Sequence, residues 1–285
     1  MSAPSAPVLA VLGRGVVDAE SAVARGDDAG LTRGDGCFEG CRLRVGPNGG
    51  VVDELDAHLA RMRRSAAALE IDFDEDGWRA VVAAAVAAWP APAEAAVKLV
   101  LTRGPLGGAP TGYAWITPLP GEIEQLRRGG LRVVALPRGL PSDAFAAAPW
   151  LLGGVKTLSY AVNMAAQREA VRRGAHDVLF LSSDGVVLEA PTSSVVWAVG
   201  RTLHTTPTGA TGILAGTTQQ LLFDRAAAAG WRTEYTTASL SDLHAADVVW
   251  LTSSVRGPID VVELDGVARR RIPSVDAEIR RLCDF

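Results

Sequence analysis

Near the middle of the chain the sequence reads Gly153-Gly154-Val155-Lys156-Thr157-Leu158-Ser159-Tyr160. Lysine is rare in this chain, because Lys98 and Lys156 are the only lysines among its 28 basic residues. A lysine amine that is desolvated, or that lies beside another cation, can form a Schiff base with a carbonyl at neutral pH. An arginine guanidinium stays charged and cannot. Taken alone, the stretch is equally compatible with a surface lysine, so Lys156 is a candidate nucleophile that the rest of the chain has to support.

Apolar residues at helical spacing follow this stretch and predict a helix over 158–173. A glycine-rich segment at 34–40 predicts a turn with a tight backbone. The other predicted elements are helices at 56–70, 78–89 and 217–229, a hairpin at 8–17, and strands at 51–55, 95–103, 113–117, 131–136, 177–182, 186–189, 194–199, 233–237, 247–251 and 261–264. Strands and helices mix without strict alternation, which favours an α/β (mixed α+β) protein in two domains.

A shift in composition marks the expected domain boundary. Two prolines (118 and 120) and three glycines (121, 129 and 130) cluster between 118 and 130, which is typical of a connecting segment. The sequence therefore predicts a smaller N-terminal α/β domain over 1–118, a linker over 119–130 and a larger C-terminal domain over 131–285.

Composition excludes several classes of partner. The chain of 285 residues is 48% hydrophobic and 21% charged, which is ordinary for a globular protein with a substantial core. Its formal net charge of −4 gives no basic surface for a nucleic acid or an anionic membrane. Three cysteines without a CxxC or Cys/His cluster predict neither a disulfide framework nor a metal site.

The N-terminus carries no basic segment ahead of an apolar one, so we expect no secretory signal. The longest apolar stretch, 78–89, is too short to cross a bilayer. We therefore expect a cytoplasmic protein with no membrane partner.

Three further segments carry candidate chemistry. Glu189 ends an apolar strand just before the hydroxyl-rich turn 192–194, where it is either a functional carboxylate or a plain turn residue. The segment 212–220 is a glycine-rich turn that opens a helix with two threonines, which favours an anion site or a simple N-cap by Thr217. A second hydroxyl cluster, 252–254, ends a predicted strand.

Together, a Schiff-base lysine, a carboxylate for a pyridinium nitrogen and one or two phosphate-binding turns match what pyridoxal phosphate needs. Over nearly its whole length the chain resembles the fold-type IV pyridoxal-phosphate enzymes, also called class IV aminotransferases. This family includes branched-chain and D-amino-acid aminotransferases and aminodeoxychorismate lyase. The matching segments are 33–39, 58–61, 101–104, the Lys156 stretch, 188–196, 214–218 and 251–254.

The resemblance implies roles for individual residues. Lys156 would link covalently to the cofactor and later move a proton, and Glu189 would pair with the protonated pyridine nitrogen. The residues implied to hold the phosphate are Arg61, Thr217, Thr218, Ser253 and Ser254.

Other positions stay open. Tyr160 lies four residues after Lys156, whereas the branched-chain enzymes carry their ring-contacting tyrosine five residues after, so Tyr160 either contacts the cofactor or packs. His58 is interpreted as structural. The candidate substrate-binding residues are Phe38, Arg103 and Arg256, and both arginines are also compatible with surface or ion-pair roles.

The resemblance allows two reactions after proton removal, since an aminotransferase forms a keto acid and a lyase expels a leaving group. Residues 34–38, Lys98 and the run 149–165 are similar to the lyases, whereas 38–40 followed by Arg42 is similar to the branched-chain enzymes. Residues 105–110 lack the Arg/His pair of the D-amino-acid aminotransferases and also the nearby arginine of the better-known lyases.

We therefore expect a 4-amino-4-deoxychorismate lyase that gives 4-aminobenzoate and pyruvate for folate biosynthesis. The alternative is a class IV aminotransferase acting on branched-chain or other amino acids. A non-catalytic binding protein, which would fail to hold pyridoxal phosphate, is a third hypothesis. Because members of the family are homodimers that share active-site residues, the resemblance also implies a homodimer.

Overall fold

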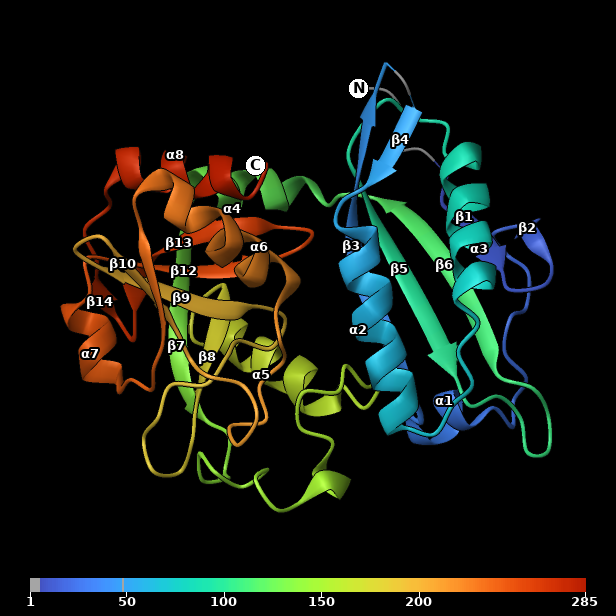
Figure 1. Ribbon diagram of the computed structural model, residues 1–285, viewed down its shortest axis with the longest axis horizontal. Coiled ribbons are helices and arrows are strands. Elements are labelled where there is room, and N and C mark those ends of the chain that lie inside the picture. The colour runs from blue at the N-terminus through green and yellow to red at the C-terminus, as the bar shows by residue number, and fades with distance from the viewer. Residues whose placement is uncertain (1–5, 48) are drawn as a thin grey trace. The chain divides into compact units, whose positions relative to one another are not determined.

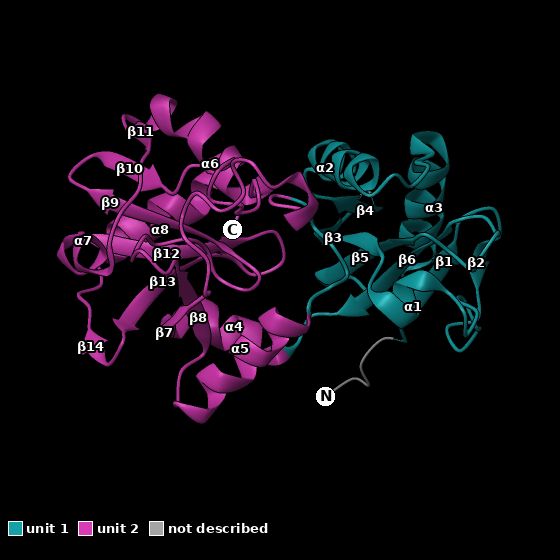
Figure 2. Cartoon of the chain, turned by 90° about the horizontal axis from the view of Figure 1, so that it is seen from below, with its two compact units in different colours: residues 1–120, 155–160 teal, residues 121–154, 161–285 magenta. Residues whose placement is uncertain are grey.

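The computed structural model describes residues 6–47 and 49–285 and divides the chain into two compact units (Figure 2). Unit 1 contains Met1–Pro120 and Val155–Tyr160, and unit 2 contains Gly121–Gly154 and Ala161–Phe285. Each unit combines a sheet with helices, so the predicted mixed α/β class is confirmed. The segment Val155–Tyr160, which the predicted boundary at residue 131 assigned to the second domain, belongs to unit 1.

Unit 1 is built on a six-stranded antiparallel sheet in the order β2-β1-β6-β5-β3-β4 (Figure 1). Its elements are β1 (Val8–Val11), β2 (Gly15–Val17), α1 (Ala29–Arg33), β3 (Gly36–Gly46), β4 (Gly49–Val52), α2 (Leu55–Ala68), α3 (Glu75–Ala88), β5 (Ala95–Thr102) and β6 (Thr111–Pro118). The predicted hairpin at 8–17 is confirmed as β1 and β2.

The turn predicted over 34–40 is confirmed at Gly34, which has a φ of 71°, but it is wrong from Gly36 onward, where strand β3 begins. Cys37, Cys41 and Leu43 are fully buried, because alternate side chains of this strand point into the core. Glu39 occupies the inward position between Cys37 and Cys41, and this charged residue interrupts the apolar alternation, which is why the period of two was not visible in the sequence.

Helices α2 and α3 pack on β3 and on β1 and β6, respectively (Figure 1). Asp74 caps α3 by accepting a hydrogen bond of 3.0 Å from the amide of Gly77, which satisfies one of the donors exposed at the start of the helix. Leu59 and Met62 of α2 and Trp78 of α3 are fully buried against the sheet. Burying such a side chain stabilises the fold by about 1.5–3 kcal/mol.

The segment Val155–Tyr160 extends the sheet of unit 1 along the first half of β3. The N–H of Phe38 donates to the carbonyl of Lys156 (3.0 Å), and the N–H of Leu158 donates to the carbonyl of Gly36 (2.8 Å). Strand β4 pairs only with the second half of β3, from Leu43 to Gly46, so this edge accepts the segment. The helix predicted over 158–173 therefore begins only at Ala161.

Unit 2 is built on an eight-stranded mixed sheet in the order β11-β10-β9-β12-β13-β7-β8, with β14 paired to β13. Its strands are β7 (Leu131–Pro137), β8 (Asp177–Leu181), β9 (Ser194–Val199), β10 (Thr202–Thr205), β11 (Arg232–Tyr235), β12 (Val248–Ser253), β13 (Gly257–Leu264) and β14 (Val267–Ala268). Its helices are α4 (Gly121–Gly129), α5 (Ala161–Arg172), α6 (Thr217–Ala226), α7 (Leu240–Ala245) and α8 (Pro273–Leu282), with 3-10 turns η1 (Pro149–Leu151) and η2 (Ala227–Ala229).

Two segments of unit 2 differ from the sequence-based expectation. Residues 186–189 form no strand, because Val186 bridges to Ser239 and Val187 bridges to Leu181, so neighbouring residues use different partners. Helix α4 lies within the predicted linker. Acidic residues in its first turn and basic residues in its last turn interact favourably with the helix dipole. Of the residues that indicated a linker, Gly121 and Gly129 are the first and last residues of the helix, and the others flank it.

Helices cover the sheet of unit 2 and bury separate apolar clusters. Helix α5 packs on β7 and β8, while α6 packs on β12 and against α8. Both arrangements follow from the apolar stripe of each helix. In the part of the chain that the structure describes, no helix has the length and apolar character required to cross a membrane.

Candidate active site

Lys156 lies among aromatic side chains of unit 1. Its Nζ is 4.4 Å from the centre of the Phe38 ring and 5.9 Å from that of Tyr160. The two rings meet edge to face, with centres 5.1 Å apart and planes at 87°. Ring faces attract an ammonium group, so these side chains can hold the lysine head in place. Tyr160 thus packs on Phe38, in line with one of the two roles left open by the sequence.

The backbone of Lys156 is fixed as firmly as its side chain. The hydroxyl of Ser65, on α2, accepts a hydrogen bond of 3.2 Å from the Lys156 amide, and the Lys156 carbonyl accepts from Phe38. Ser65 is buried, so its hydroxyl supplies an acceptor where water is excluded. The lysine is therefore carried by a segment whose backbone is held by hydrogen bonds to β3 and to α2.

Arg61 belongs to a buried charged cluster with Glu39 and His58, which we call the arginine cluster. The guanidinium donates from Nε to Glu39 Oε1 (2.8 Å) and from Nη2 to Glu39 Oε2 (2.7 Å). Nδ1 of His58 lies 2.7 Å from the same Oε2. His58 and Arg61 are three residues apart on α2, so both side chains lie on the face that meets β3.

Glu39 is fully buried, and the charges around it decide its ionisation. Burial raises the pKa of this carboxyl, but the charge of Arg61 and the hydrogen bonds from Arg61 and His58 outweigh burial and lower the pKa to about 2. The carboxylate therefore stays ionised at any pH at which the protein would work.

In unit 2, hydroxyl groups meet at the N-terminus of α6 and form what we call the hydroxyl cluster. Thr217 Oγ1 lies 2.9 Å from Ser254 Oγ, and Thr218 Oγ1 donates to the same oxygen over 3.3 Å. The N-cap of α6 is Gly216, which has no side chain to accept from the first amides of the helix. Hydroxyls beside the positive end of a helix suit an anion such as phosphate. Ser254 joins the cluster, whereas Ser253 ends β12 opposite Gly257.

Backbone packing keeps this turn narrow. A Cβ on Gly216 would stand 2.3 Å from the Ser194 hydroxyl, which is closer than real atoms approach. Glycine at this position therefore lets the helix start lie directly against β9.

The carboxylate of Glu189 is mostly buried in unit 2 and is held by two donors. Nη1 of Arg138 lies 3.2 Å from Oε1, and the amide of Leu214 donates to Oε2 over 3.1 Å. The backbone of Glu189 is fixed as well, because its carbonyl accepts from the amide of Phe180. Glu189 is thus an oriented hydrogen-bond acceptor, as a partner of a ring N–H has to be.

Arg103, a candidate substrate-binding residue, stabilises the end of α2. It forms an ion pair with Asp35 (2.5 Å) and donates to the carbonyls of Leu69 (2.6 Å) and Glu70 (3.2 Å). These carbonyls are among the acceptors left over at a helix C-terminus. The contacts give Arg103 a structural role within unit 1.

Arg256, the other candidate arginine, is likewise occupied within unit 2. Its Nη2 lies 2.7 Å from the fully buried carboxylate of Asp177, 2.8 Å from the Ser193 hydroxyl and 3.2 Å from that of Thr192. A buried carboxylate needs such a partner, so Arg256 supports the sheet around β8.

Three residues at these sites were missed in the sequence: Glu39, Ser65 and Arg138. Glu39 lies within the matching segment 33–39 but was given no role there. Each of the three contributes through a contact with an element distant in the chain, which a local motif does not reveal. The spacing of His58 and Arg61 indicated a shared helix face, which could have prompted a search for a buried acid.

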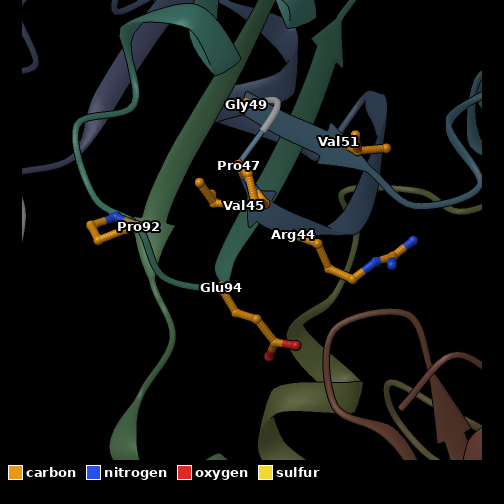
Figure 3. A pocket seen from close by; sticks show the side chains of 8 residues that line it. Arg44, Val45, Pro47, Gly49, Val51, Pro92 and Glu94 are labelled. Carbon is orange, nitrogen blue, oxygen red and sulfur yellow. The ribbon is translucent and has the colours of Figure 1, made fainter.

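Unit 1 has a surface hollow of about 580 Å³ whose lining includes none of these residues (Figure 3). It is lined by Arg44, Val45, Gly46, Pro47, Gly49, Val51, Pro92 and Glu94. Its two charged side chains already form ion pairs, Arg44 with Asp53 and Glu94 with Arg42. Within residues 6–47 and 49–285, no group of three or more acidic, histidine or cysteine side chains is arranged to hold a metal ion.

Comparison with known proteins identifies the family. Residues 36–264 match the model for amino-transferase class IV. The chain is 42% identical over 257 residues to a bifunctional aminodeoxychorismate lyase / D-amino acid transaminase from Mycobacterium tuberculosis, covering 87% of this chain and 86% of that protein.

Solved structures of similar proteins support the same family assignment. The chain is similar to a hypothetical aminotransferase from M. tuberculosis in its PLP-bound form, with a TM-score of 0.91, 38% identity and 97% of both chains covered. It is also similar to a fold IV transaminase from Curtobacterium pusillum, with a TM-score of 0.90, 37% identity and 97% of both chains covered. The resemblance drawn from the sequence is thus confirmed, and this chain belongs to the class IV aminotransferase family.

Proposed function

We propose that this protein is a pyridoxal-phosphate enzyme that converts 4-amino-4-deoxychorismate into 4-aminobenzoate and pyruvate. The observation that carries the cofactor assignment is the hydroxyl cluster at the uncapped start of α6. The preference for the lyase reaction is supported by the 42% identity to a relative whose name includes aminodeoxychorismate lyase.

The residues present fit the cofactor chemically. Thr217, Thr218 and Ser254 would bind the phosphate together with the first amides of α6, and Arg61 would add a positive charge. Glu189 would accept a hydrogen bond from the ring nitrogen, and Lys156 would form the covalent link. When bound, pyridoxal phosphate supplies an electron sink that acidifies the carbon next to the substrate's amine.

The side chains of the protein would carry out the proton transfer and hold the lysine in place. The amine of Lys156 would take the proton from the ring carbon that bears the substrate amine. Departure of the enolpyruvyl ether leaves an aromatic ring, and enolpyruvate becomes pyruvate once its carbon takes up a proton. Phe38 and Tyr160 would keep the lysine amine aligned for this transfer. We further propose that the enzyme acts as a homodimer in the cytoplasm.

The experiment supplies enzymatically generated aminodeoxychorismate and follows 4-aminobenzoate by fluorescence. Wild-type protein should release aminobenzoate and show an absorbance band of lysine-bound cofactor. Lys156→Ala and Lys156→Arg should lose both, because neither side chain can form the Schiff base. No release from a wild-type protein that shows the band would contradict the lyase reaction.

A second candidate is an aminotransferase, because the same relative also carries the name D-amino acid transaminase. Steady formation of keto acid from an amino acid and 2-oxoglutarate, without aminobenzoate release, would favour it. A screen of L- and D-amino donors with the same preparation measures this directly.

A further inference from the structure

The arginine cluster contains a charged group that the proposed reaction does not use directly. Glu39 is fully buried, and Arg61 is 5% exposed. Burying a carboxylate and a guanidinium costs several kcal/mol for each ion, which the attraction between them offsets only with good geometry. A buried ion pair therefore adds little net stability on average, and the geometry of this one points to a role other than stabilising the fold.

That geometry constrains the guanidinium on one edge. Glu39 takes the Nε–Nη2 edge of Arg61 through two hydrogen bonds, and His58 Nδ1 lies against the same carboxylate. A guanidinium recognises paired oxygens only when its plane is correctly oriented, and the contacts with Glu39 and His58 set that orientation. The other arginine–glutamate contact of α2, between Arg63 and Glu75, is an exposed pair with a single 3.2 Å bond and imposes no comparable orientation.

We infer that Glu39 is the positioning residue that, with His58, fixes Arg61 for recognition of the cofactor's phosphate. This inference rests on the proposed function, in which Arg61 contacts that phosphate. Glu39 acts through Arg61 and touches neither cofactor nor substrate in this scheme.

The isosteric change Glu39→Gln isolates this role. Both oxygens of Glu39 accept from donors of Arg61, so an amide nitrogen in either position faces an N–H. In a site that excludes water, the guanidinium has to move to avoid the donor–donor contact. Affinity for the phosphate should fall while the rest of the cofactor site stays in place.

The test compares pyridoxal phosphate with pyridoxal, which lacks the phosphate, by absorbance titration of the cofactor-free protein. For Glu39→Gln we expect the Kd of pyridoxal phosphate to rise roughly tenfold or more, and the Kd of pyridoxal to change less than about twofold. The matched control is Glu75→Gln, which removes a glutamate paired with arginines at the surface and should leave both constants unchanged.

If the Kd of pyridoxal phosphate and the Kd of pyridoxal rise by the same factor, Glu39 only stabilises the fold and the inference is overturned. The inference is also overturned if neither Kd changes, because the ratio of the two constants is then that of the wild type. If Glu39→Gln fails to fold, Glu39→Asp replaces it, because the shorter carboxylate cannot span Arg61 and His58 together. A wild-type ratio in that variant also overturns the inference. Wild-type protein that binds neither ligand would overturn the proposed function as well, whereas tight wild-type binding with an unchanged ratio removes only the role of Glu39.

Discussion

The backbone N–H of Phe38 donates a 3.0 Å hydrogen bond to the carbonyl of Lys156, while the Phe38 ring lies 4.4 Å from the lysine Nζ. One residue of β3 thus holds both ends of the candidate catalytic lysine. Both contacts come from the protein itself, so they can orient the lysine before any ligand arrives.

Gly36→Ala should release the segment that carries Lys156. A Cβ at this position would stand 2.5 Å from the Leu101 carbonyl oxygen and 2.7 Å from a methyl group of Leu158. We expect a loss of about 1–3 kcal/mol in the free energy of unfolding and faster hydrogen exchange over 155–160. Gly40→Ala on the same strand is the control, since nothing lies within 4 Å of its Cβ. Equal exchange in the two variants would contradict the pairing.

Arg256→Gln should destabilise the protein instead of weakening substrate binding alone. It leaves the fully buried Asp177 without its ion pair, which costs about 3 kcal/mol in urea unfolding. Arg25→Gln removes an exposed pair with Asp27 and should change stability by less than about 1 kcal/mol. Normal stability with a raised KM would instead favour the substrate-binding role first expected for Arg256.

The pKa of Glu39 predicts a specific acid sensitivity. Because the folded-state pKa is lowered from 4.5 to about 2, the carboxylate contributes stability above pH 4.5 that is lost as the pH falls towards 2. This contribution is on the order of 3 kcal/mol. Urea unfolding at several pH values should show the gap between wild type and Glu39→Gln shrinking below pH 4.5. A gap that is constant with pH would mean that the charge of Glu39 contributes nothing.

The three cysteines should resist thiol reagents in the native state. All are buried, and burial together with the charge of Glu39 raises the pKa of Cys37 to about 12. At pH 8 we expect negligible reaction with a disulfide reagent until urea is added, because thiolates are the reactive form. Ser274→Cys, at an exposed position of α8, is the positive control and should react within minutes. Rapid reaction of Cys37 or Cys41 in the wild-type protein would show that β3 opens readily, and rapid reaction of Cys283 would show the same for the end of α8.

Local patterns in the sequence identified most elements but not the contacts between distant ones. The spacing of His58 and Arg61 predicted a common helix face, and α2 presents both. Their partner Glu39 was not inferred, because this charged residue itself interrupts the apolar alternation of the strand that carries it. The pairing of Val155–Tyr160 with β3 was not predicted either, since a segment held by two backbone hydrogen bonds carries no periodicity of its own.

In the candidate site, too, local patterns identified residues but not their distant contacts. The threonines of α6 and the serines after β12 were chosen from the sequence, and the structure brings Ser254 to both threonines. Arg138 was missed because its contact with Glu189 depends on the register of β7 and β8. Arg103 and Arg256 were chosen for their charge, which says nothing about the acids and carbonyls that occupy them.

The pairing of Val155–Tyr160 with β3 has a consequence for synthesis on the ribosome. Ser159, whose hydroxyl donates to the carbonyl of Gly34, is made 125 residues later. Part of β3 in the newly made N-terminal sheet therefore stays unpaired until the segment Val155–Tyr160 leaves the exit tunnel. Such an exposed edge is a natural substrate for chaperones, and a fragment that stops at Pro120 should aggregate more readily than the complete chain.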